Sequence, residues 1–529
     1  MTKQPILING RWDNEPSPLT FTPVNPSTGE SFSDQYPIST LDTLKKMADY
    51  ASGAAETLNH CSPDLIARFL ESHAANIDQR RNEIAQVAHL ETGLPYQPRL
   101  HETEMNRTID QLRRTADCVR SRDWMTARID TRLNLRSMYE PLGGAVLIIG
   151  PNNFPLAYNA IAGGDFAAAI AAGNPVIAKA HPLHPVTTRL LAECAHDAVL
   201  TLGLPGSTVQ MFYQCEPDDG LAMIKLPQIS SVGFTGSQRV GLELKRAADE
   251  TGTPIYLELS SINPIFLLPA ALEERCVEIA NMIADSMLAG SGQQCTCPGM
   301  IVIPAGDLAL AFSEQLSKRL SEAPPQVMLS ADGVQGLHDS VQHLLHHGAE
   351  QLVGGHPISD AHAKYANTLL RIDASRYLQQ PATMQREMFG VAAFIVVCQH
   401  DEQMIDIART LEGNLTGTIH QGKNGQDKEQ SARLTRALRP RVGRLIHNGV
   451  PTGVSVNPAT VHGGPFPATG HPGFTAVGMP TSIHRFAALR CYDRVREGSL
   501  PPELRDANPT GTMRRFVDGE WTTGDAMPN

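Results

Sequence analysis

The sequence lacks the features that mark several large classes of protein. It has no run of about 18 apolar residues, so no membrane-spanning helix is expected, and residues 1–5 do not resemble the start of a secretory signal peptide. Lys and Arg number 44 against 55 Asp and Glu, a formal charge of −11, which argues against a nucleic-acid partner. The nine cysteines are irregularly spaced. They form no disulfide framework and fit reduced thiols in a cytoplasm.

The length and composition are those of a large globular protein, and proteins of this kind are most often enzymes. Apolar residues make up 41% of the chain and charged residues 19%, which is typical of an ordinary folded protein rather than of a disordered one. The chain has 529 residues, too many for a single hydrophobic core. Two or more domains are therefore expected.

The middle of the chain alternates between short apolar runs and helical patterns. Residues 145–149 are a continuous apolar run between two glycines, typical of a strand buried on both faces. Strands that alternate with helices of this length need crossover connections, which indicates a parallel sheet. We predict a doubly wound, dinucleotide-type α/β domain over 140–260, after a largely helical region over 41–121. Further strands are predicted at 176–178, 209–212, 229–234, 255–259, 300–303 and 391–397, and a long loop at 449–475.

Cys295 lies just after a glycine-rich helix end, in the segment 290–297 (GSGQQCTC). An irregular backbone there can expose a thiol and hold it in place, as a nucleophile requires. A free thiol has a pKa of about 8.5, so it also needs a base or a positive potential nearby. Considered alone, the segment is explained at least as well by a structural cysteine in a loop. Cys295 and Cys297 have too few metal-binding neighbours in the sequence for a zinc site.

Two other polar residues follow predicted strands. Glu258 is a lone carboxylate at the end of the apolar strand 255–259, where partial desolvation would raise its pKa and suit it to general-base catalysis. Asn153 follows the strand 145–149, and open parallel sheets bind ligands beyond the carboxyl ends of their strands. Its side-chain amide can donate to an oxyanion there. A glutamate that caps a helix and an asparagine in a turn beside proline remain the alternatives.

Gly236 and Ser237 join a predicted strand to a predicted helix. The start of such a helix offers free N–H groups and a positive dipole to a phosphate, although the segment matches neither of the common glycine-rich phosphate motifs. His343, His346 and His347 have helical spacing but no further ligand nearby. We interpret them as a solvated face of a helix, and no metal site is predicted.

Seven short segments occur in an order and spacing that resembles one known family. They are 140–143 (EPLG), 153–155 (NFP), Lys179, 234–237 (FTGS), 258–259 (EL), 292–295 (GQQC) and 387–390 (EMFG). Together they resemble the aldehyde dehydrogenase superfamily over nearly the whole chain. The resemblance implies an α/β fold with a Rossmann-type cofactor domain, an α/β catalytic domain and a bridging element for oligomerisation. It also implies the NAD(P)-dependent oxidation of an aldehyde to a carboxylic acid.

The resemblance implies a catalytic role for three residues. Cys295 would attack the aldehyde carbon to form a thiohemiacetal, and hydride transfer to the nicotinamide would leave a thioester. The side-chain amide of Asn153 and the backbone N–H of Cys295 would hold the oxyanion, and one such donor is worth roughly 3–4 kcal/mol of barrier. Glu258 would activate the water that hydrolyses the thioester.

The resemblance also implies cofactor residues. Lys179 would bind the adenosine ribose, Gly236 and Ser237 the pyrophosphate, and Glu387 and Phe389 the nicotinamide ribose side. Both NADP and NAD remain candidates. Pro182 stands where the superfamily has a ribose-binding glutamate, and the absence of that carboxylate would admit the 2′-phosphate of NADP. The acidic segment 216–219, however, lacks the arginine that NADP-preferring relatives often carry. Ser260, where glycine is usual, is expected to crowd the turn after Glu258.

Closer variants of these motifs resemble one branch, the α-ketoglutaric semialdehyde dehydrogenases and the related NADP-dependent fatty-aldehyde dehydrogenases. By that resemblance Arg107 and Phe154 would contact the substrate, and Arg107 would hold the distal carboxylate of α-ketoglutaric semialdehyde. A solvated Arg107 and a medium- or long-chain fatty aldehyde are the alternatives. Two alternatives to an active enzyme also remain: a catalytically silent relative of the family, and a redox sensor that uses Cys295 and Cys297. The branch variants are 180–185 (AHPLHP), 261–264 (SINP), 449–453 (GVPTG), 461–465 (VHGGP) and 501–509.

The family's organisation gives the expected domains. Residues 1–121 and 143–259 would form the dinucleotide-binding domain and residues 260–473 the catalytic domain. Residues 122–142 and 474–500 would form the bridging element, followed by a C-terminal tail at 501–529. The expected partners are a small-molecule aldehyde and further copies of the chain in a homodimer or homotetramer, with no nucleic acid and no membrane.

Overall fold

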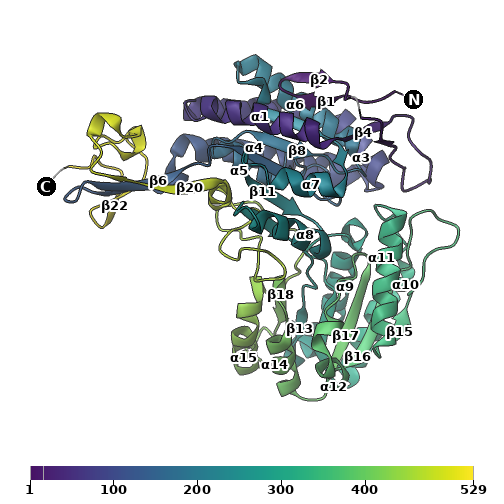
Figure 1. The fold of residues 1–529 in the computed structure, drawn as a ribbon. Helices are drawn as coiled ribbons and strands as arrows, with labels where there is room; N and C mark the ends of the chain where they lie inside the picture. Colours follow the sequence, from purple (N-terminus) through teal and green to yellow (C-terminus); the bar gives the residue numbers. More distant parts are fainter. Residues whose placement is uncertain (1, 16, 528–529) are drawn as a thin grey trace.

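The structure is a computed structural model that describes residues 2–15 and 17–527. Two seven-stranded sheets form the two halves of its body, and a five-stranded sheet forms an arm that projects from the first half (Figure 1). The first sheet has the order β12-β11-β7-β8-β9-β1-β2. Its strands are β1 (Ile6–Ile8), β2 (Arg11–Asp13), β7 (Ala145–Ile149), β8 (Val176–Lys179), β9 (Val209–Phe212), β11 (Ile229–Thr235) and β12 (Ile255–Glu258).

The first sheet confirms the predicted doubly wound arrangement. Five neighbouring strands, from β12 at one edge to β9, are parallel. The chain starts at β7, adds β8 and β9 on one side, and then adds β11 and β12 on the other. The reversal next to β7 is a topological switch point, the usual place for a ligand in such sheets. The predicted strand 145–149 matches β7, which is buried along almost all of its length because helices cover both faces.

The helical region predicted over 41–121 contains four α-helices. Thr40 and Ser62 accept hydrogen bonds from the first turns of α1 and α2, and Gly93 ends α3 in the left-handed conformation at φ 68°. A π-helical segment, Tyr96–Glu104, separates α3 from α4. The helices of this half are α1 (Leu41–Leu58), α2 (Pro63–Gln79), α3 (Arg81–Thr92), α4 (Met105–Ser121), α5 (Gly164–Ala171), α6 (Pro185–Leu202), α7 (Pro217–Ile224) and α8 (Gln238–Asp249).

The second half of the body is built on a sheet of order β15-β16-β17-β14-β13-β18-β19. All its strands are parallel except β15 at one edge. Helices α9 (Pro269–Leu288) and α10 (Asp307–Glu322) pack on it, as do α11 (Ala331–His346), α14 (Asp401–Thr410) and α15 (Lys428–Leu438) (Figure 1). The strands are β13 (Ile265–Leu267), β14 (Met300–Pro304), β15 (Glu350–Val353), β16 (Thr368–Asp373), β17 (Ala392–Cys398), β18 (Asn414–His420) and β19 (Val442–His447).

The arm joins segments from both ends of the chain. Its strands have the order β20-β6-β5-β21-β22. The residues assigned to a separate tail, 501–529, supply two of them, and β21 runs parallel to β5 with Phe516 opposite Arg128. The strands are β5 (Arg128–Asp130), β6 (Leu135–Pro141), β20 (Ala487–Asp493), β21 (Arg515–Val517) and β22 (Glu520–Thr522).

Candidate active site

The parallel strands of the first sheet deliver several predicted site residues to one edge. Thr235 of β11 lies opposite Glu258 of β12, and Ile149 of β7 lies between Phe234 of β11 and Lys179 of β8. The loop after β7 carries Asn153, and the loop after β11 carries Gly236 and Ser237. Because parallel strands end at the same edge, these residues face the second half of the body across the carboxyl ends of the sheet.

The backbone that carries Cys295 is irregular, as its glycine-rich sequence predicts. After α9, Gly290, Ser291 and Gly292 all have φ between 59° and 67°, the left-handed region. A Cβ on Gly292 would lie 2.3 Å from the carbonyl carbon of Gly390, so only glycine fits. Nδ2 of Asn263 donates to the carbonyl of Cys295 at 2.9 Å and to that of Cys297 at 3.0 Å. The loop that holds the thiol is therefore fixed by close backbone packing and by a buried amide.

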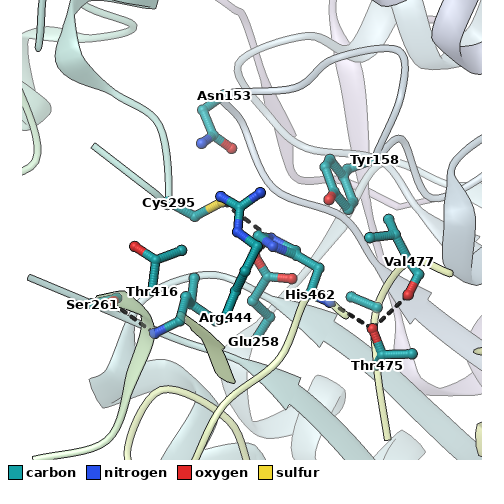
Figure 2. Close-up of polar contacts among 12 residues, drawn as sticks. Asn153, Tyr158, Glu258, Ser261, Cys295, Thr416, Arg444, His462, Thr475 and Val477 are labelled. Carbon is teal, nitrogen blue, oxygen red and sulfur yellow. Dashed lines mark hydrogen bonds and ion pairs between the residues drawn. The ribbon is translucent and has the colours of Figure 1, made fainter. Parts of the chain in front are cut away.

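Cys295, Glu258 and His462 point toward one another at the centre of the site (Figure 2). Sγ of Cys295 lies 3.4 Å from Nε2 of His462, and the same nitrogen lies 2.9 Å from Oε1 of Glu258. His462 and Glu258 are buried, with 2% and 4% of their surface exposed. The backbone N–H of His462 donates to Oγ1 of Thr475 at 2.7 Å, which anchors the loop that carries the ring. Both contacts involve the same nitrogen, so Nε2 can either accept a hydrogen bond from the thiol or donate one to the carboxylate.

His462 was not predicted as a functional residue. It lies in the long loop after β19, 167 residues from Cys295 and 204 from Glu258. The segment VHGGP marked a branch of the family, but nothing in its spacing connects it to a nucleophile. The loop reaches the site because Leu259 donates its N–H to the carbonyl of Ala468 at 2.8 Å, immediately beside Glu258.

The electrostatics of the three groups differ from the sequence-based prediction for Glu258. Burial favours a raised pKa for this carboxyl, but the charge and hydrogen bond of His462 outweigh it, so the pKa lies below its usual value. The predicted upward shift is wrong because the sequence did not reveal the imidazole. Burial raises the pKa of the Cys295 thiol well above its usual value, and the charge of Glu258 raises it further. The thiol therefore needs an adjacent base to lose its proton at neutral pH.

Asn153 lies on the loop after β7, and Figure 2 draws it on the same side of the site as Cys295. Nδ2 of the buried amide donates one hydrogen to the carbonyl of Gln293 at 2.9 Å. That bond orients the side chain and leaves its second amide hydrogen for another acceptor. An oxygen bound next to Sγ would be such an acceptor, which is the role predicted for Asn153.

A cavity of about 500 Å³ opens onto the thiol. Arg107 and Phe154, the two predicted substrate residues, both line it. Nη2 of Arg107 donates to the hydroxyl of Tyr158 at 3.0 Å, and its guanidinium carbon lies 4.9 Å from the centre of the Tyr158 ring. Among the described residues, no carboxylate lies within ion-pair distance of Arg107, and its buried Nε has no hydrogen-bond partner. Arg99, on the same wall, is by contrast paired with Glu104.

A second cavity, of about 680 Å³, is lined by residues of both halves of the body. Ser237 lies on one side, where its hydroxyl accepts from Val240 at the start of α8, and Glu387 lies on the other. Burial raises the pKa of Glu387 to about 7, although the hydroxyl of Ser260 and the N–H of Ser261 donate to it. Ser260 thus contacts a predicted cofactor residue.

The remaining predicted cofactor residues lie near the same edge of the sheet. Lys179 ends β8, where burial lowers its pKa to about 8 and its Nζ donates to the carbonyl of Ala180 at 3.3 Å. The N–H of Gly236 donates to the carbonyl of Glu258 at 3.0 Å. Phe389 is half-buried in the loop whose next residue, Gly390, packs against Gly292. The half-buried cation, the helix start and the half-buried carboxyl fit the ribose and phosphate groups of a dinucleotide.

Two further features bear on function. His343, His346 and His347 lie at the end of α11, as their spacing predicts, and His343 Nε2 is hydrogen-bonded to the carbonyl of Thr383 at 3.1 Å. Within residues 2–15 and 17–527, no helix has the length and apolar character that crossing a membrane requires.

Comparison with known proteins gives a consistent result. The aldehyde dehydrogenase family matches residues 12–467. An α-ketoglutaric semialdehyde dehydrogenase 2 of Azospirillum brasilense is 37% identical, over 86% of this chain and 87% of its own. An α-ketoglutaric semialdehyde dehydrogenase of Acinetobacter baylyi is 34% identical, over 94% of both chains. The solved structure of aldehyde dehydrogenase C of Pseudomonas syringae, with NAD+ and octanal, has a TM-score of 0.80 at 21% identity and covers 93% of this chain and 96% of its own.

A doubly wound sheet that faces a half-buried thiol beside a buried imidazole and carboxylate is the arrangement expected of a nucleotide-dependent oxidoreductase. The chain belongs to the aldehyde dehydrogenase family. It is an NAD(P)-dependent aldehyde dehydrogenase with the α/β fold that its sequence predicted.

The position of His462 makes a prediction for the thiol. In His462→Asn the base beside Sγ is lost, so alkylation of Cys295 by iodoacetamide at neutral pH should slow by about 10²-fold, the usual contribution of a positioned base. Peptide mapping by mass spectrometry measures the rate at Cys295 itself. His471→Asn, in the same loop but on Tyr256 and Phe474, is the matched control and should leave the rate unchanged. Equal rates in wild type and His462→Asn would exclude His462 as the base.

Proposed function

We propose that this enzyme oxidises α-ketoglutaric semialdehyde to 2-oxoglutarate. The observation that carries the proposal is Arg107 in the cavity that opens onto the thiol, which has no ion-pair partner among the described residues and a buried Nε without a hydrogen bond. A guanidinium without a counter-ion favours a substrate that brings a carboxylate, and the planar group can bind it with two hydrogen bonds. The names of the two relatives at 37% and 34% identity support the same substrate.

The first step in the proposed mechanism is activation of the nucleophile. In the tautomer that carries its proton on Nδ1, Nε2 of His462 takes the proton of the Cys295 thiol across the 3.4 Å contact. The resulting imidazolium donates to the carboxylate of Glu258, which stabilises it. The thiolate attacks the aldehyde carbon and forms the C–S bond of a thiohemiacetal. The free hydrogen of the Asn153 amide and the N–H of Cys295 receive the negative charge that develops on the aldehyde oxygen.

Residues around the second cavity would hold the cofactor. Ser237 at the start of α8 would bind its phosphates, Lys179 the adenosine ribose, and Glu387 and Phe389 the nicotinamide ribose side. The nicotinamide cofactor, when bound, supplies the acceptor for the aldehyde hydride. Pro182 leaves Lys179 without a neighbouring carboxylate, and no ion pair to it occurs among the described residues. We therefore propose that the site admits the 2′-phosphate of NADP as well as NAD.

Glu258 completes the reaction by hydrolysis of the Cys295 thioester. Its Oε2 is buried and has no hydrogen-bond partner, so it is available to a water molecule. The carboxylate takes a proton from that water, the oxygen attacks the acyl carbon, and the thiolate leaves with the electrons of the C–S bond. The product is a carboxylic acid, and the thiol is regenerated when it regains a proton.

The alternative substrate is a medium- or long-chain fatty aldehyde. Phe154, Val454 and Val456 give the substrate cavity an apolar part, and a long-chain-aldehyde dehydrogenase of an Acinetobacter species is 25% identical over 76% of this chain and 79% of its own. The two hypotheses differ in whether the cavity needs a cation. Comparison of α-ketoglutaric semialdehyde with hexanal, which has no carboxylate, distinguishes them.

Replacement of Arg107 tests the proposed substrate. Arg107→Ala should raise the KM for α-ketoglutaric semialdehyde about 10- to 100-fold, the range for one lost charged hydrogen-bonding partner, and leave that for hexanal nearly unchanged. Steady-state rates with NAD and with NADP measure both. Arg113→Ala is the matched control, because Arg113 lies on the same helix but is exposed and weakly paired with Asp78. Equal effects of Arg107→Ala on the two aldehydes would contradict the assignment.

We also propose that the arm mediates assembly into a homodimer or homotetramer. The outer edge of β20 is unpaired within the described part of the chain, and Leu489 on this strand is 55% exposed. An open strand edge with an exposed apolar side chain is a common site of association between subunits.

A further inference from the structure

Three side chains of types that can bind a metal ion lie together at the thiol, onto which the substrate cavity of about 500 Å³ opens. Sγ of Cys295, Nε2 of His462 and a carboxylate oxygen of Glu258 all lie within 4.8 Å of one another, and within the described residues this is the one group of its kind. They come from three separate segments: the loop after α9, the long loop after β19, and the end of β12. This donor set, one sulfur, one nitrogen and one oxygen, is the kind that Zn²⁺ binds in proteins.

Two of the three separations between these atoms are close to those of a zinc site, and the third, between Sγ and the carboxylate oxygen, is at most 4.8 Å. Tetrahedral zinc with bonds of about 2.3 Å to sulfur and about 2.0 Å to nitrogen holds the two atoms about 3.5 Å apart. The Sγ–Nε2 distance is 3.4 Å, so this edge of the tetrahedron needs no adjustment. The Nε2–Oε1 distance of 2.9 Å would have to open by about 0.5 Å.

Glu258 provides a second, independent observation. Its Oε2 is buried and makes no hydrogen bond, so the carboxylate has a free acceptor beside the imidazole and the thiol. A buried carboxylate oxygen without a partner is costly unless a water or an ion occupies the space next to it. The catalytic water uses this oxygen during turnover, and a metal ion would use it at rest.

We propose that Cys295, His462 and Glu258 form an inhibitory Zn²⁺ site. The thiol loses its proton to solvent when zinc binds, so a thiolate, a neutral imidazole and a carboxylate hold the ion, and their two negative charges balance its charge. The fourth position opens toward the aldehyde cavity, which Cys295 and His462 both line, and is filled by water.

Bound zinc would stop the proposed reaction at every step that these residues perform. The sulfur could not attack an aldehyde, Nε2 could not take a proton, and Glu258 could not activate water. Arg107 and Arg444 are close enough to Cys295 to act on it electrostatically, and their positive charges oppose a further cation. The site should therefore release zinc to a chelator, which makes the inhibition reversible.

Direct binding of metal to the cofactor-free chain tests this proposal. Isothermal titration with Zn²⁺ should give one equivalent bound, and Co²⁺ in its place should show a thiolate-to-cobalt charge-transfer band. Cys295→Ser, His462→Asn and Glu258→Gln should each weaken zinc binding by at least about 100-fold, since even groups that only support a ligand are worth 10- to 100-fold. The cobalt band should disappear in Cys295→Ser.

The surface histidines provide the matched control. His343 and His347 have ring centres 4.3 Å apart on α11 and could bind zinc by themselves. His347→Asn should leave the affinity and the cobalt band unchanged. The proposal is overturned if His347→Asn abolishes binding, if Cys295→Ser does not, or if no cobalt–thiolate band appears.

The proposed zinc site uses the same side chains as the proposed reaction, but it does not depend on which aldehyde the enzyme oxidises. Aldehyde oxidation in metal-free buffer is therefore measured in parallel. Activity without zinc binding overturns the metal site alone. Zinc binding without oxidation of α-ketoglutaric semialdehyde overturns the proposed function alone.

Discussion

Cys295→Ala is expected to lower kcat for aldehyde oxidation by at least about 10⁴-fold, because no other group can form the covalent intermediate. The alanine removes Sγ but leaves the loop, whose shape depends on Gly292 and on the amide of Asn263. The affinity for the reduced cofactor, measured by the change in cofactor fluorescence on binding, should therefore be unchanged. Loss of activity with intact cofactor binding would show that the defect lies in the chemistry and not in the fold.

Cys297→Ala is the control for this experiment. Its thiol is buried and lies 3.9 Å from the carbonyl of Pro298, and only its backbone carbonyl contacts Asn263. Removing Sγ leaves those backbone contacts in place, so Cys297→Ala should keep kcat within a few-fold of wild type. If activity survives Cys295→Ala but not Cys297→Ala, Cys297 is the nucleophile and the assignment to Cys295 is wrong.

Glu258→Gln is expected to lower kcat by about 10²- to 10⁴-fold, the usual range for a general base. The amide keeps the shape of the side chain but cannot take a proton from water. His462 still lies beside the thiol in this variant, so the thioester should form faster than it is hydrolysed. Stopped-flow absorbance should then show a burst of reduced cofactor, about one equivalent per active site, followed by slow turnover.

The burst separates two roles of the carboxylate. If Glu258 acted mainly in formation of the thioester, the variant would be slow from the first turnover and no burst would appear. Asn153→Ala provides the matched comparison, because loss of an oxyanion donor slows formation of the thiohemiacetal itself and should remove any burst. An unchanged kcat in Glu258→Gln would exclude this residue as the base for hydrolysis.

The sequence predicted the elements of the site that depend on local pattern. The strand 145–149 and the glycine-rich segment before Cys295 were visible because burial and irregular backbone leave direct traces in composition. The roles of Glu258 and Asn153 were suggested by their places after predicted strands, with structural alternatives left open, and resemblance to a family then assigned them. Their positions at the carboxyl edge of one sheet agree with those roles.

His462 could not be predicted in the same way. It lies in a loop without periodicity, and its partners are 167 and 204 residues away along the chain. The error about the pKa of Glu258 has the same origin, because desolvation could be inferred from the strand but the imidazole could not. A long loop that crosses a site leaves no local signal of where its side chains lie.

Two tight turns, one near each end of the chain, carry a strong local signal for a hairpin. Asn9-Gly10 and Asp518-Gly519 each close a two-residue hairpin with positive φ at both positions, a strong local signal. Both hairpins were thus recognisable from sequence. The pairing of β21 with β5, which links the tail to the arm, depends on tertiary packing and was not.

Peptide mapping of the Glu258→Gln variant tests the central claim most directly. The protein is mixed with α-ketoglutaric semialdehyde and cofactor, quenched in acid during the burst, digested, and analysed by mass spectrometry. The account predicts an acyl group with the mass of a 2-oxoglutaryl thioester on Cys295 and none on Cys297. An adduct on Cys297, or reduced cofactor formed without any acylated cysteine, would contradict it.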